Sequence, residues 1–336
     1  MIESLTGDAG VRESLEQLRP SGGAVEALAR VSWSVLTEPG DGVAGALIEE
    51  LGASDALRLA LGAGNAAGPE VSSRALADGR ARWKTRADAR SVVDALCGAR
   101  DVGARLLIPG DAHWPTSLDD LGVHAPAVLW VRGDPRLLSA APRVAIVGAR
   151  AASAYGEMLA GDFAGELAAG GAVVVSGGAY GIDGAGHRAA LGVGGKTVAF
   201  LAGGVDRAYP QGHQQLLRRI VETGAVVSEV PCGTAPTKWR FLSRNRLIAA
   251  VSDATVVVEA GWRSGSLNTA GHAAALGRPL GAVPGPVTSA SSAGCHRLLR
   301  EYDARCVTTT AEIRELWGDG PPGTSCLLYT SDAADE

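Results

Sequence analysis

From residue 144 onward, the chain alternates short valine-rich apolar runs with segments of helical periodicity. The runs are continuously apolar, which is typical of strands buried on both faces of a parallel sheet. Helices are predicted between these strands, which lie at 144–148, 172–177, 197–204, 225–230, 254–260 and 279–285. This order predicts an extended Rossmann-like, doubly wound α/β fold, with helices on both faces of a mostly parallel sheet.

The segment before this alternation has a different pattern. Residues 1–23 are a lead that we expect to be poorly ordered or loosely helical. Residues 24–100 show helical spacing broken by short glycine turns, which predicts a small all-helical domain. A SAM-like or helix-hairpin-helix-like module fits this pattern, and so does a helical cap without a ligand. The Rossmann-like domain then spans 104–318, and 319–336 is expected to be a disordered or non-native tail.

The apolar runs, the cysteines and the net charge of the chain argue against several classes of protein. No apolar run approaches the roughly 18 residues that a membrane-spanning helix needs, and the N-terminus lacks the apolar core of a signal peptide. The five cysteines are scattered without C-x-x-C pairs, which argues against a disulfide framework or a zinc site. We therefore expect a cytoplasmic protein without a metal or a membrane partner. The net charge of −5 repels polyanions weakly, so a nucleic-acid site needs a local cluster of cations.

Glycine-rich and basic turns follow the predicted strands, at the edge where open parallel sheets bind ligands. Ser264, Gly265 and Ser266 open a helix whose N–H groups suit phosphate, although an ordinary serine N-cap is the alternative. Neither G-x-G-x-x-G nor G-x-x-x-x-G-K-[ST] is present, and we expect no cofactor. Arg150 stands where a dinucleotide fold has its second glycine, and its planar guanidinium suits a phosphodiester or a stacked base.

The strongest local signal is KWRFLSRNR at 238–246, which carries four cations, two aromatic residues and no acid. Cations neutralise phosphates and aromatic rings stack on bases, which is what sequence-tolerant binding of single strands requires. A solvated amphipathic helix with Trp239 and Phe241 in the core has the same composition. The position of the segment after a strand, on the glycine-rich edge, favours binding.

Catalytic interpretations have less support in the sequence. Asp183 and His187 are spaced to share a helix face, where a histidine is more often a structural hydrogen-bond partner. Glu229 and Glu259 are expected to end adjacent strands and could form a carboxylate pair. A hydrolase also needs a positioned nucleophile or metal, and the sequence identifies none. We therefore expect a binding protein rather than an enzyme.

Seven blocks of the sequence, in order, resemble the DNA-processing protein A (DprA/Smf) family. They cover about residues 105–310 and read WPTSLDDLGVHAPAVLWVRGDP, VAIVGARAASAYG, SGGAYGIDGAGHRAAL, AGGVDRAYPQGH, VVSEVPCGTAPTKWRFLSRNRLIAA, VVVEAGWRSGSLNTAGHAA and AVPGPVTSASSAGCHRLL. Seven blocks in sequence are far more specific than any single glycine motif. The helical segment before them resembles the SAM-like domain of the family.

This resemblance implies a homodimeric protein that holds single-stranded DNA in a basic pocket. It also implies that the protein protects incoming DNA and loads the RecA recombinase onto it during natural transformation. The implied binding residues are Arg150, Lys238, Phe241, Arg244, Asn245 and Arg246, supported by Gly265 and Ser266. Tyr180 stands where some relatives carry a lysine in the A-x-G-I-D motif, which weakens one phosphate contact or replaces it with stacking. The winged-helix module of some members is not found, so we expect no duplex binding through it.

Two other functions remain open at this point. A nucleotide-binding or nucleoside-monophosphate-hydrolysing enzyme would share a related Rossmann-like fold. Such enzymes carry a PGGxGTxxE-type turn, which the stretch from Glu259 to Thr269 lacks. A purely structural dimeric scaffold is the other alternative, and it leaves the run of four cations unexplained.

Overall fold

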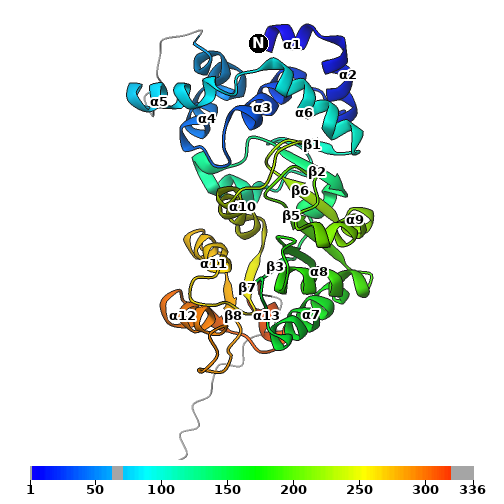
Figure 1. Cartoon of the computed structure of the whole chain (residues 1–336), viewed down its shortest axis with the longest axis vertical. Helices are drawn as coiled ribbons and strands as arrows, with labels where there is room; N and C mark the ends of the chain where they lie inside the picture. Colours follow the sequence, from blue (N-terminus) through cyan, green and yellow to red (C-terminus); the bar gives the residue numbers. More distant parts are fainter. Residues whose placement is uncertain (1, 63–70, 319–336) are drawn as a thin grey trace, which may run out of the picture.

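The computed structural model describes residues 2–62 and 71–318, and the predicted tail at 319–336 lies outside this described part. A helical unit occupies one end of the long axis, and an α/β unit extends from it to the other end (Figure 1). The helices of the helical unit are α1 Ile2–Gly7, α2 Ala9–Leu18, α3 Ala24–Leu36, α4 Gly42–Ala60, α5 Ser73–Lys84 and α6 Ala89–Asp101.

Residues 2–18, part of the lead expected to be poorly ordered or loosely helical, form two helices, α1 and α2, that pack on each other. Val11, Leu15 and Leu18 form one apolar stripe on α2 at helical spacing, and all three are buried. They join a core shared with α3 and α6, so the stripe has a partner surface. Asp8 caps α2 by accepting a hydrogen bond from the Val11 N–H.

The α/β unit is built on a nine-stranded sheet in the described residues. Its strands are β1 Arg105–Leu107, β2 Leu129–Gly133, β3 Arg143–Val147, β4 Val173–Ser176, β5 Lys196–Phe200, β6 Ala225–Ser228, β7 Ala254–Val257, β8 Leu280–Ala282 and β9 Arg305–Cys306. Their spatial order is β1-β2-β6-β5-β4-β3-β7-β8-β9. Neighbouring strands are parallel in the part of the sheet that reads β6-β5-β4-β3-β7-β8-β9. At one edge, β2 pairs antiparallel with β6, and β1 pairs antiparallel with β2. The prediction of a doubly wound, mostly parallel sheet is therefore confirmed.

Helices cover both faces of the sheet. One face carries α7 Ala154–Ala169, α8 Ile182–Gly192 and α9 Gln214–Thr223, and the other carries α10 Lys238–Val251, α11 Ser266–Ala275 and α12 Ala293–Glu301 (Figure 1). A last helix, α13 Thr310–Glu315, packs on α7. Three short 3-10 helices lie in the connections, at Thr116–His124, Pro135–Leu138 and Gln211–His213.

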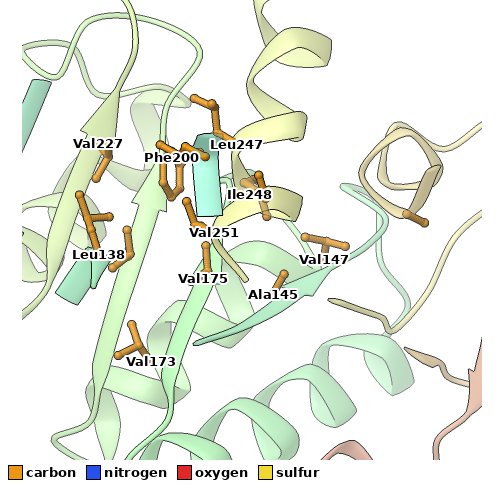
Figure 2. Packing of buried hydrophobic residues seen from close by; sticks show 14 of the residues in the cluster. Leu138, Ala145, Val147, Val173, Val175, Phe200, Val227, Leu247, Ile248 and Val251 are labelled. Atoms are coloured by element: carbon orange, nitrogen blue, oxygen red, sulfur yellow. The ribbon is translucent and has the colours of Figure 1, made fainter. Parts of the chain in front are cut away.

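The core under α10 fixes how that helix lies on the sheet. Leu247, Ile248 and Val251 of α10 are buried against side chains from β3, β4, β5 and β6 (Figure 2). The apolar second half of α10 is thereby held on the sheet, because every third or fourth residue faces inward. The basic first half of the helix then lies at the carboxyl edge of the strands.

The strand order creates a crevice at that edge. After β3 the chain builds β4, β5 and β6 on one side, and it then returns to place β7 on the other side of β3. The loops that follow β3 and β7 therefore diverge, and such a switch point is where open α/β sheets bind ligands. The same order corrects the expectation that Glu229 and Glu259 end adjacent strands, because β5, β4 and β3 lie between β6 and β7.

Candidate nucleic-acid interface

A pocket of about 800 Å³ occupies this crevice, between the loops that follow β3 and β7 and the first half of α10. Seven of the eight predicted binding residues line it, namely Arg150, Lys238, Phe241, Arg244, Asn245, Gly265 and Ser266. The loops after two separate strands, β3 and β7, and two helices, α10 and α11, contribute them. The structure thus brings together residues that are as far apart in the chain as 150 and 266.

The start of α10 divides its cations between two faces. The helix begins at Lys238, because Thr237 caps it by accepting a hydrogen bond from the Arg240 N–H. Lys238, Phe241 and Asn245 follow helical spacing and line the pocket. Arg240 lies on the other face and donates to both carboxylate oxygens of Glu38, at 2.9 Å each, in the connection between α3 and α4.

Arg246 is the predicted binding residue that does not line the pocket. Its guanidinium donates to both carboxylate oxygens of Glu229, at 2.8 and 2.6 Å, and its Nε donates to the His124 carbonyl. The side chain is only 6% exposed. Arg246 therefore stabilises the junction of α10 with its neighbours and is not among the residues that line this pocket.

Arg150 and Phe241 form the centre of the pocket. The guanidinium carbon of Arg150 lies 4.5 Å from the centroid of the Phe241 ring, which is cation–π geometry. Arg150 and Lys238 are both exposed, and neither has a carboxylate within 4.0 Å among the described residues. Two cations without ion-pair partners in the described residues thus line the pocket together with this aromatic ring.

Glu259 holds the turn that presents Arg150. Its carbonyl accepts from the Ala149 N–H at 2.7 Å, and its carboxylate accepts from the N–H and the hydroxyl of Ser153 at 2.8 Å each. The carboxylate is therefore used within the turn, and three strands separate β7, which precedes Glu259, from β6, which precedes Glu229. This contact replaces the catalytic carboxylate pair considered from the sequence.

Arg244 is a buried cation that points toward the pocket wall. Gly177 makes room for it, because a Cβ at that position would lie 1.5 Å from Arg244 Nη1. Burial lowers the pKa of Arg244 to about 10, so the side chain stays charged at neutral pH. Its Nε is buried without a hydrogen-bond partner among the described residues. A buried guanidinium in this state is well suited to an anionic ligand.

Asp183 interacts electrostatically with Arg244. Burial raises the pKa of Asp183, while the charge of Arg244 and hydrogen bonds from the Gly177 and Ala179 N–H groups oppose that rise. The carboxylate thus fixes the loop after β4. His187 is bound elsewhere, with Nδ1 2.7 Å from the hydroxyl of Thr197, and burial lowers its pKa to about 3. Asp183 and His187 have separate structural partners.

The start of α11 forms the opposite wall of the pocket. Asn245 donates to the Gly265 carbonyl at 3.3 Å and to the Asn268 side chain at 3.2 Å, which ties α10 to this turn. Gly265 is the N-cap, and no side chain caps the helix. The Ser264 hydroxyl instead bonds to that of Ser266. The N–H groups that open α11 have partners within the turn: Ser266 donates to the Ser264 hydroxyl at 3.4 Å, Leu267 to the Ser264 carbonyl at 3.2 Å and Asn268 to the Gly265 carbonyl at 3.1 Å. This end of α11 lines the pocket, where the helix dipole favours an anion.

Sequence reasoning did not assign Tyr209 and Arg263 to the binding site, although both line the pocket. Each follows a parallel strand, and that position was the available signal. Tyr209 contacts Phe241, with ring centroids 5.3 Å apart. Among the described residues, no group of three His, Cys, Asp or Glu side chains could hold a metal, and no helix is long and apolar enough to cross a membrane.

The model of the DNA recombination-mediator protein A family matches residues 105–318. The chain belongs to this family. It is 52% identical to the DprA protein of Mycobacterium tuberculosis over 249 residues. That alignment covers 69% of this chain and 64% of the relative, so the chain spans less than two thirds of that protein.

Two solved structures of DNA processing protein A are similar to this family member. The Streptococcus pneumoniae structure is 30% identical with a TM-score of 0.67, and the match covers 85% of this chain and 95% of that one. The Helicobacter pylori structure, described for its single-stranded DNA binding mode, is 31% identical with a TM-score of 0.58. That match covers 63% of this chain and 94% of the other.

Proposed function

We propose that this protein binds single-stranded DNA in the pocket between β3 and α10 and acts as a recombination mediator. The observation that carries the proposal is the group of cations around one aromatic ring. Arg150 and Lys238 lack carboxylate partners in the described part of the chain, and Arg244 keeps a buried Nε unbonded. These groups suit phosphates, and Phe241 beside Arg150 suits a stacked base.

The aromatic ring favours a single strand over a duplex. Bases in a duplex are paired and stacked, so their faces are not free to contact a side chain in a pocket. A single strand can turn a base onto Phe241 while its phosphates meet the surrounding cations. The binding mode described for the Helicobacter pylori relative supports this choice.

The net charge of −5 makes the binding strictly local. The protein as a whole repels DNA weakly, and attraction arises only where unpaired cations converge. We therefore expect affinity to fall steeply with salt, because phosphate contacts release counterions from the strand.

Binding is tested by anisotropy titration of one labelled sequence in its single-stranded and double-stranded forms. We expect clear preference for the single strand, loss of that preference in Arg150→Ala and Lys238→Ala, and normal binding by Arg136→Ala. Arg136 is a matched control, because it lies after β2 and pairs with Asp134. Equal binding of both DNA forms, or hydrolysis of nucleoside monophosphates by the same preparation, would contradict the proposal.

We further propose that the protein works in the cytoplasm as a homodimer, protects incoming DNA and loads RecA onto it in natural transformation. Family membership and the pocket support this wider role. Strand exchange by RecA on DNA coated with a single-strand-binding protein provides the test. The wild-type protein should accelerate the exchange and Lys238→Ala should not. No acceleration by a wild-type protein that binds DNA would exclude the mediator role and leave the binding site intact.

A further inference from the structure

Beyond Phe241, aromatic side chains continue along the rim of the pocket. Tyr209 lines the pocket and packs against Phe241. Tyr180, in the loop between β4 and α8, packs edge-on against His213 with ring centroids 4.7 Å apart. Tyr209 and Tyr180 are 45% and 49% exposed. Two half-exposed tyrosines therefore lie outward from Phe241, which is at the pocket.

Tyr180 and Tyr209 are joined through one short turn. A Cβ at Gly212 would lie 2.5 Å from Tyr180 Oη, so the glycine makes room for the tyrosine. Gly212 is three residues after Tyr209 in the same connection. Neighbouring residues thus lead from the pocket outward, in the spatial order Phe241, Tyr209, Gly212 and Tyr180.

The Tyr180 ring has a rigid support. His213 is buried, and its Nδ1 lies 3.0 Å from the Gly178 carbonyl, which fixes the imidazole under Tyr180. A ring that is held on one side and exposed on the other costs little conformational entropy when a base stacks on it. The buried imidazole of His213 thus gives Tyr180 a support that a surface tyrosine does not need for solubility or folding.

A cation lies at the outer end of this surface. A Cβ at Gly184 would meet His213 Cε1 at 2.6 Å and Arg188 Nη1 at 3.1 Å, which places the Arg188 guanidinium beside the imidazole. Arg188 is exposed, and no carboxylate of the described residues comes within 4.0 Å of it. Its charge is therefore available to a ligand, as are those of Arg150 and Lys238 in the pocket.

We propose that the bound single strand leaves the pocket over Tyr209, stacks a base on Tyr180 and places a phosphate against Arg188. The inference rests on the proposed function and adds the path that the strand follows outside the pocket. Aromatic rings that alternate with unpaired cations match the alternation of bases and phosphates in the strand. If Tyr180 only shielded His213, its loss would change stability and leave DNA binding unaltered.

The test compares oligo(dT) of about 4 and about 16 nucleotides, the limits of the sites found on single-strand-binding domains. Tyr180→Ala should weaken binding of the longer strand between about 5-fold and about 150-fold, the range for one lost base stack, and leave the shorter strand unchanged. Tyr180→Phe should bind like the wild type. Val193→Ala is the matched control, because Val193 is 52% exposed at the other end of α8.

Arg188→Ala should reduce the slope of log affinity against log salt by about 0.7 for the longer strand, as expected for one phosphate contact. Lys196→Ala is its control, because Lys196 begins β5 at the opposite edge of the sheet. In the wild-type protein, a longer strand that carries photoreactive 5-iodouracil should crosslink to Tyr180. This readout does not depend on the folding of any variant.

The outcomes separate the two proposals. If the wild type binds neither strand, the proposed function itself fails. If the wild type binds both and Tyr180→Ala weakens neither, or weakens both equally, the path over Tyr180 is overturned and the pocket stands. Absence of a crosslink to Tyr180 in a bound complex overturns the path in the same way.

Discussion

Replacing Gly177 with alanine tests whether the buried guanidinium of Arg244 reaches DNA. A Cβ at this position would lie 1.5 Å from Arg244 Nη1, 2.5 Å from Cζ and 2.6 Å from Nη2. All three separations are far below van der Waals contact. Because Gly177 does not have a positive φ, alanine fits its backbone, and the clash with Arg244 is the dominant effect.

The size of the effect follows from what the displaced guanidinium would lose. Arg244 has to leave its niche beside Gly177, which removes one charged contact to the strand, worth about 1–3 kcal/mol. The slope of log affinity against log salt should also fall by about 0.7. Crowding in the niche should lower the free energy of unfolding by about 1–3 kcal/mol.

Anisotropy titrations of labelled oligo(dT) over a salt series measure the binding terms, and urea unfolding measures stability. Gly161→Ala is the matched control, because a Cβ there meets only Ala189 Cβ at an ordinary 3.9 Å. That variant should bind DNA like the wild type. A folded Gly177→Ala protein with wild-type affinity and salt slope would refute the assignment of Arg244 to the DNA site.

Three further predictions concern the pocket, the Arg246–Glu229 ion pair and the buried His187. Arg150→Ala and Phe241→Ala should each lower affinity for oligo(dT) by about 1–3 kcal/mol. The double variant should lose less than the sum of the two single losses, because the two side chains are in contact. Strict additivity would argue against a shared site. Arg246→Ala should lower the free energy of unfolding by about 3–5 kcal/mol, because it leaves the carboxylate of Glu229, only 12% exposed, without its partner. Titration of the folded fraction should show unchanged DNA affinity, and a large loss of affinity would place Arg246 on the binding surface. Because the pKa of His187 in the folded protein is depressed to about 3, the unfolded chain takes up the proton first as pH falls below about 6.5. The free energy of unfolding should therefore drop by about 1.4 kcal/mol at about pH 5.5. Urea unfolding of His187→Gln should show that this pH dependence is lost.

Much of the candidate site follows from the sequence through one geometric rule. Carboxyl ends of parallel strands share an edge, so residues that follow separate strands must converge there. This rule places Arg150, Gly265 and Ser266 in one pocket with the start of α10, although they are distant in the chain. The strands themselves are indicated by continuous valine-rich runs, which are typical of strands buried on both faces of a parallel sheet.

The sequence does not determine which cations of α10 are free. Lys238 and Arg244 line the pocket, whereas Arg240 and Arg246 bind Glu38 and Glu229. A run of like charges around a helix points in several directions, and each neighbouring element decides which charge is neutralised. Glu38 lies in the helical unit, 202 residues from Arg240, so no local pattern reveals this pair.

Strand order is the other property that only the tertiary structure decided. Glu229 and Glu259 follow consecutive strands in the chain, and the sequence suggested that they are neighbours. The sheet instead inserts β7 beside β3, on the far side of β4 and β5 from β6, which separates the two acids and opens the crevice. Sequence periodicity specifies the strands because burial selects residue types one strand at a time. The order of the strands depends on long-range packing between both faces of the sheet, which no single segment encodes.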